Sequence, residues 1–151
     1  MNRTQRRQAE RKERRGIVYS ERIIPLPALL DEFTVFDMPQ SIIDQLTNGT
    51  IDAADDVPVF RDNRGQWCEV VPALEGWLFT WRKINSALDL DLYFDAMELL
   101  ASRLGKNIWL NPPHIEMAAK ELQACRCAFR TADRKEISRI AKTAQIQILM
   151  E

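Results

Sequence analysis

One histidine and three cysteines are the residues of this chain that most often bind metals or act as nucleophiles: His114, Cys68, Cys125 and Cys127. His114 and Cys125 lie on one face of a predicted helix, but they are eleven residues apart, which corresponds to about 16 Å along its axis. Cys125 and Cys127 project about 200° apart on the same helix, and the C-x₂₋₄-C spacing of zinc sites is absent. We therefore expect no metal site and no cofactor.

A cysteine nucleophile needs a thiolate stabilised by positive charge and a base within reach. Arg126 and Arg130 make the surroundings of Cys127 electropositive, but His114 lies three turns away on the same helix and is out of reach. Only Cys68 could meet His114 across the fold, and no motif supports that pair. We expect reduced thiols and a histidine that serves the start of its helix.

Neighbouring acidic residues could act as a general acid and base. They occur at Asp31–Glu32, at Asp55–Asp56 and at Asp89 and Asp91. We interpret Asp55–Asp56 as solvated loop residues, and Asp89 and Asp91 as partners of a helix dipole at a helix start. The chain also lacks the glycine-rich phosphate-binding loops, the nucleophile elbow and the H-E-x-x-H zinc motif. These observations predict a protein that is not an enzyme.

Positive charge is concentrated at the beginning of the chain. Residues 1–16 carry two acidic side chains and seven basic ones, which are Arg3, Arg6, Arg7, Arg11, Lys12, Arg14 and Arg15. The whole chain has 21 basic and 22 acidic residues, so this arm has a net charge of +5 and residues 17–151 have one of −6. A basic arm on an acidic body is typical of nucleic-acid contact. The alternatives are an arm that folds back on its own acidic surface and a solvated tail.

The arginines of the arm recur at helical spacing, but a helix this short with no apolar face is marginal in water. We expect residues 1–16 to be disordered alone and helical on a partner. The run TQRRQAERKERR (residues 4–15) resembles the arginine-rich RNA-binding motif of lambdoid phage antitermination N proteins, a short helix that also combines arginines with an interspersed Glu. The resemblance implies that Arg6, Arg7, Arg11, Arg14 and Arg15 contact RNA, through phosphates and base stacking. It is confined to the arm, and no Trp follows the run.

The remaining chain has the length and composition of one folded domain. It is 151 residues long and 46% hydrophobic, which is enough for a core, and no run approaches 18 consecutive apolar residues. No apolar segment follows the first positive charges, and Glu10 and Glu13 argue against a mitochondrial presequence. We therefore expect a cytoplasmic protein without a membrane span, with residues 17–151 as a single helical domain.

Prolines and a polar turn divide the first part of this domain. Pro25 and Pro27 exclude a regular helix, so the apolar residues 17–36 are predicted to form an extended strap across the core. A short helix is expected from Pro39 to Asn48–Gly49. Residues 57–71 predict a β-hairpin whose polar turn lies at residues 62–65.

Residues 72–151 show the spacing of four amphipathic helices. The first has its apolar stripe at Leu74, Trp77, Leu78, Trp81, Ile84 and Leu88, and the second is predicted to start at Asp89 and end at Gly105. The third begins with Asn111 as its cap and Pro112 in its first turn, and the fourth begins near Asp133. Whether the last two helices are continuous is open at this point. The predicted fold is mainly α, a bundle of about four helices with one small β-hairpin and the basic arm.

Two aromatic residues lie outside the predicted core stripes. Phe79 faces away from the stripe of its helix, and Trp109 lies in the loop before residue 111. Either is a candidate anchor for a protein partner, and packing against the strap is the alternative. We therefore expect a small accessory or regulatory protein whose arm contacts nucleic acid, RNA in preference to duplex DNA, and whose acidic body binds a protein. The alternative is a pure protein-interaction module, such as an inhibitor, adaptor or assembly factor, with an incidental tail; the size and two-part design suit a phage- or mobile-element-encoded factor.

Overall fold

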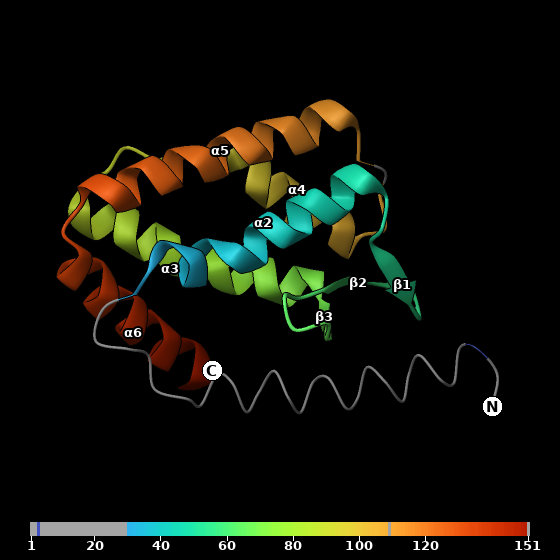
Figure 1. The fold of residues 1–151 in the computed structure, drawn as a ribbon, viewed down its shortest axis with the longest axis horizontal. Coiled ribbons are helices and arrows are strands. Elements are labelled where there is room, and N and C mark those ends of the chain that lie inside the picture. The colour runs from blue at the N-terminus through green and yellow to red at the C-terminus, as the bar shows by residue number, and fades with distance from the viewer. Residues whose placement is uncertain (1–2, 4–29, 109, 151) are drawn as a thin grey trace.

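The computed structural model describes residue 3, residues 30–108 and residues 110–150. Within these ranges the chain forms five helices and one antiparallel sheet (Figure 1), as expected for a mainly α protein. The helices are α2 (Glu32–Asn48), α3 (Val70–Leu88), α4 (Asp95–Gly105), α5 (Pro112–Thr131) and α6 (Arg134–Met150), and the strands are β1 (Asp52–Ala54), β2 (Val57–Arg61) and β3 (Trp67–Glu69). The predictions for the arm beyond Arg3, for residues 17–29 of the strap and for Trp109 lie outside the described residues.

Helix α2 starts seven residues earlier than the sequence predicts. Asp31 caps it by accepting a hydrogen bond from the main-chain N–H of Thr34 at 2.6 Å, and Gly49 ends it with a φ of +69°. Pro39 therefore lies inside the helix, where it is buried, and not in the first turn. The prediction of an extended strap is wrong from residue 32 onward, because a proline was taken to mark the helix start.

The sheet has three strands in the order β1–β2–β3, so the predicted hairpin is its β2–β3 half. Strand β1 pairs with β2 through Ala54 opposite Val57. The two residues between them, Asp55 and Asp56, have φ values of +53° and +64°, the geometry of a type I′ turn. These aspartates are turn residues that close a second hairpin, which the sequence analysis missed.

Helix α3 follows β3 directly and ends at Asp89, whose backbone is left-handed with a φ of +51°. Asp91 has a φ of +56° in the same turn. Both residues therefore follow one helix, and the prediction that Asp89 starts the next one is wrong. Helix α4 begins only at Asp95, and its N-terminus is capped from another helix: the Glu121 carboxylate of α5 accepts hydrogen bonds from the N–H groups of Ala96 and Met97, at 3.0 and 2.8 Å.

Helices α5 and α6 are separate. Thr131 ends α5, and Asp133 accepts hydrogen bonds from the N–H groups of Lys135 and Glu136 at the start of α6. At the other end of α5, Asn111 and His114 form a capping box. The structure thus answers the question of continuity that the sequence left open, and the predicted helix starts at Asn111–Pro112 and near Asp133 agree with it.

Aromatic residues form the centre of the core. Phe36 of α2 packs against Trp81 of α3 and Phe129 of α5, with ring centroids 5.5 and 5.7 Å apart. Trp77 lies against Trp81 on the same face of α3. Helix α2 lies between α5 and α3, while α6 and the sheet lie toward opposite ends of the molecule (Figure 1). The predicted stripe of α3 is buried in this core at Leu74, Trp77, Leu78, Trp81 and Ile84.

Among the described residues, none of the helices combines the length and apolar content that a membrane-spanning segment requires.

Candidate functional site

The thiols and the histidine do not come together. Cys125 is fully buried, and burial raises its pKa to about 12, with a further contribution from Glu121. Cys127 is exposed on the opposite side of α5, and the Cys68 thiol lies 3.8 Å from the carboxylate of Asp62. The Nδ1 atom of His114 accepts the N–H of Asn111, so this side chain serves the helix start. Within the described ranges, no three His, Cys, Asp or Glu residues are grouped so that they could hold a metal ion.

The neighbouring acidic residues also have local structural roles. Asp31 caps α2, and its neighbour Glu32 forms an ion pair with Arg130 of α5. This arginine lowers the pKa of Glu32 through its hydrogen bond. Asp55 and Asp56 form a turn, as described above. These contacts supply no pair of carboxylates directed at a common point.

The candidate binding residues fall partly inside the described chain. Arg3 is exposed, whereas Arg6, Arg7, Arg11, Lys12, Arg14, Arg15 and Trp109 lie outside the described residues. Phe79 is half-buried on α3, and the ammonium group of Lys83 lies 5.3 Å from the centre of its ring. Phe79 also lines a large hollow of the described structure.

This hollow, the long groove, has a volume of about 1150 Å³ and runs between α2, the β2–β3 hairpin, α3 and α6. Its walls are Leu30 and residues Phe33, Thr34, Val35, Asp37 and Met38 of α2; Val59, Phe60, Asp62, Asn63, Arg64, Trp67, Cys68 and Glu69 of the hairpin; Pro72, Ala73, Glu75, Gly76, Trp77, Phe79, Thr80, Trp81 and Ile84 of α3; and Ile137, Ala141, Gln145, Ile148 and Leu149 of α6. The volume exceeds the range of about 300–1,000 Å³ typical of small-molecule pockets. The long groove is therefore large enough for a segment of polypeptide.

Apolar side chains dominate the walls toward α6. Phe33 is 64% exposed and Leu149 is 44% exposed. Ile148 and Phe79 are half-buried beside them. A ligand that covers these four residues would remove a sizeable apolar area from water, which is the main source of favourable binding energy.

Acidic residues dominate the charge of the groove. Among the described residues, Asp37, Asp62, Glu69 and Glu75 line it with one cation, Arg64. Burial raises the pKa of Asp37, and the negative charge of Asp62 raises it further. A positively charged ligand would relieve this repulsion, so the long groove favours a partner that combines apolar and basic side chains.

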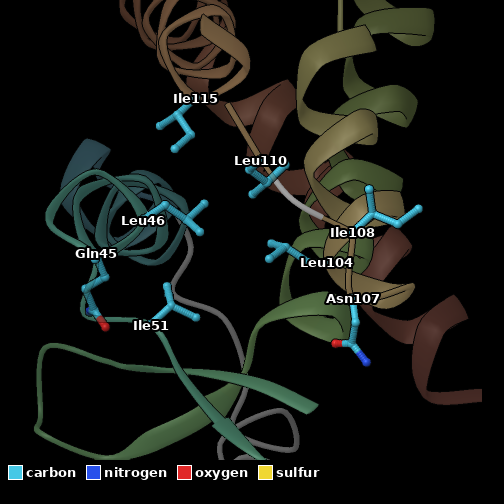
Figure 2. A pocket seen from close by; sticks show the side chains of 9 residues that line it. Gln45, Leu46, Ile51, Leu104, Asn107, Ile108, Leu110 and Ile115 are labelled. Carbon is cyan, nitrogen blue, oxygen red and sulfur yellow. The ribbon is translucent and has the colours of Figure 1, made fainter. Parts of the chain in front are cut away.

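A second, smaller pocket of about 350 Å³ lies between the end of α2, the start of β1, the end of α4 and the start of α5. Figure 2 shows Leu46 and Leu104 approaching its centre from two sides, with Ile51, Leu110 and Ile115 around it. The amide of Gln45 is already bonded, since it donates to the carbonyl of Arg61 and accepts the N–H of the same residue. No charged residue among those described lines this pocket, so it offers little to orient a ligand.

Of the two interface residues predicted from the sequence, Phe79 lines the long groove, and its position off the core stripe indicated it. Phe33 was not predicted, because residues 17–36 were assigned to an extended strap. The acidic cluster was not predicted either, since Asp37 and Asp62 come from α2 and the hairpin and approach each other only in the folded chain. The signal available in the sequence was Phe33, a phenylalanine two residues after the capping residue Asp31.

The chain matches no protein-family model, and comparison with curated proteins and with solved structures finds no similar protein.

Proposed function

We propose that this chain is a small, non-enzymatic accessory protein that contacts RNA through its basic arm and binds a protein segment through the long groove. The observation that carries the proposal is the separation of charge. Seven of the 21 basic residues lie in the first sixteen positions, and the body that follows has a net charge of −6. Such an arm neutralises phosphates and releases counterions, whereas the acidic body repels a nucleic acid.

The long groove supports the second half of the proposal. It joins the exposed side chains of Phe33 and Leu149 to the acidic side chains of Asp37 and Asp62. An amphipathic or extended segment with apolar and basic side chains complements both features. The structural roles of His114, Cys125 and the neighbouring aspartates favour binding over catalysis.

RNA titrations across a salt series test the proposed function. A variant in which Arg6, Arg7, Arg11, Arg14 and Arg15 are changed to Ser should lose binding, and the slope of log K against log salt should fall by up to about 3.5, since each phosphate contact on single-stranded RNA contributes about 0.7. The matched control changes Lys120, Lys135 and Lys142, which are exposed on α5 and α6, to Ser and should leave the slope unchanged. Equal binding by all three proteins would reject the RNA half.

That outcome would favour the alternative of a pure protein-interaction module. The two halves are separable, because Phe33→Ser and Phe79→Ser alter the groove without altering the arm. In the proposed function these variants bind RNA like the wild type.

A further inference from the structure

The continuous stretch of described residues begins at Leu30, inside the long groove. Leu30 lines the groove and is only 6% exposed. Its main-chain N–H donates a hydrogen bond of 3.0 Å to the hydroxyl of Ser138 on α6, and Ser138 is the only buried polar residue among those described. Leu30 is therefore held at the groove wall.

The thirteen residues before Leu30 have the composition of a groove ligand. Residues 17–29 read IVYSERIIPLPAL, with only Ser20, Glu21 and Arg22 as polar residues. Left in water, Ile23, Ile24 and Leu26 would expose a contiguous apolar patch, which proteins avoid. Pro25 and Pro27 carry no N–H, so this stretch has fewer main-chain donors to satisfy when it is buried without a strand partner.

From these two observations we propose that residues 17–29 of the same chain bind in the long groove. The inference rests on the proposed function of the groove as a site for a protein segment, and it adds that a partner must displace this segment first. In an extended conformation thirteen residues reach about 45 Å. The nineteen residues of α3, which forms the longest wall, span about 28 Å. The segment is long enough to follow the groove from end to end.

Charge disfavours a second copy of the chain as the occupant. In the part of the chain that the structure describes, the groove has four carboxylates and one arginine. Residues 17–29 are neutral, since Glu21 and Arg22 cancel, and the arm that precedes them has a net charge of +5. The body of a second copy, with its net charge of −6, would bring negative charge to an acidic surface.

Covalent attachment adds a second advantage. A segment tethered at Leu30 has an effective concentration in the millimolar range for a short linker. A free partner with similar contacts is present in cells at far lower concentration and competes poorly unless it binds more tightly. The groove therefore has its own chain as the default ligand.

Photo-crosslinking in the full-length protein tests this placement. p-Benzoylphenylalanine replaces Ile24, the protein is irradiated as a dilute monomer, and the attachment points are mapped by mass spectrometry. We expect crosslinks to α3, α6 or the hairpin, within one chain and independent of protein concentration. The matched control places the same amino acid at Lys120, which is exposed on α5 and outside the groove; this probe should leave the groove residues unlabelled.

A second variant excludes a chance contact. Ile23→Asp in the chain that carries the probe should lower the crosslinked fraction about ten-fold, because a buried isoleucine is replaced by a charge. Crosslinks to α5, no change on Ile23→Asp, or crosslinks between chains that rise with concentration would each overturn the proposal. The RNA titrations are independent of this result, so a failure of the arm to bind RNA would reject the RNA half of the proposed function and leave the placement of residues 17–29 standing.

Discussion

The indole N–H of Trp77 donates a hydrogen bond of 3.2 Å to the main-chain carbonyl of Val35. In a regular helix this carbonyl would accept the N–H of residue 39, but residue 39 is a proline and has none. Trp77 thus supplies, from α3, the donor that α2 lacks. This contact explains how a proline is tolerated in the middle of α2, close to the aromatic centre of the core.

We expect the contribution of this hydrogen bond to depend on Pro39. Trp77→Phe leaves the Val35 carbonyl without a donor, which costs about 1–3 kcal/mol in addition to the loss of packing. In a Pro39→Ala background the helix itself supplies the N–H, so the same substitution should cost about 1 kcal/mol less. A double-mutant cycle with chemical denaturation measures the difference. Equal costs of Trp77→Phe in the two backgrounds would contradict this explanation.

Periodicity predicted the parts of the fold in which one helix face is buried. The predicted stripe of α3 was correct from Leu74 to Ile84. In an amphipathic helix the spacing of the apolar residues indicates which face is buried. The start of α2 was not predictable in this way. Its internal proline is compensated by Trp77, which is 42 residues from its hydrogen-bond acceptor Val35 in the chain. A local rule for proline therefore gave the wrong start.

Contacts between residues that are distant in the chain also limited the prediction of the remaining elements and of the candidate site. The N-terminus of α4 is capped by Glu121, about 25 residues further along the chain, so no cap appears in its own sequence. Strand β1 has only three residues, and its turn uses Asp55–Asp56 instead of the usual Asn-Gly. The long groove is formed by four separate elements, and only Phe79 signalled it locally.

In the turn between β1 and β2, we expect two substitutions of Asp56 to change the free energy of unfolding in opposite directions. Asp56 has a left-handed backbone, which suits Gly and is strained for a β-branched residue. Asp56→Gly should keep or slightly raise the free energy of unfolding, and Asp56→Val should lower it by about 1–2 kcal/mol. At Lys120, exposed on α5, the order should reverse, because Gly is worse than Val in a helix by a few tenths of a kcal/mol. Thermal unfolding of the Gly and Val variants at positions 56 and 120 measures which of the two is more stable at each position. An Asp56→Val variant as stable as Asp56→Gly would exclude the type I′ turn.

The cysteines should differ strongly in reactivity. The pKa of about 12 leaves about one part in ten thousand of Cys125 as thiolate at pH 8, and its side chain is fully buried. Cys127 is exposed on the same helix. A thiol reagent should therefore modify Cys127 in the native protein and Cys125 only upon unfolding, and Cys127→Ser should remove the fast phase. Modification of Cys125 in the native state, at a rate independent of denaturant, would contradict the described packing.

Glu121 should make stability depend on pH. Burial raises its pKa above the usual value near 4.5, although the N–H groups of Ala96 and Met97 favour the carboxylate. Because the folded state holds this proton more tightly than the unfolded state, the contribution of Glu121 to the free energy of unfolding is largest below about pH 4.5 and falls as the pH rises through the raised pKa.

Two substitutions separate the charge of Glu121 from its capping role. Glu121→Gln should remove this part of the pH dependence, since Gln does not titrate, while it keeps one acceptor for α4. Glu121→Ala leaves the buried N–H groups of Ala96 and Met97 without their acceptor and should lower the free energy of unfolding by about 1–3 kcal/mol at pH 7. Glu116→Ala, at an exposed position of the same helix, should change it by less than about 0.5 kcal/mol. Urea unfolding between pH 4 and pH 8 measures the free energy of unfolding of the wild type and of the three variants. If Glu121→Ala were as stable as Glu116→Ala, the cap between α5 and α4 would contribute nothing to the fold.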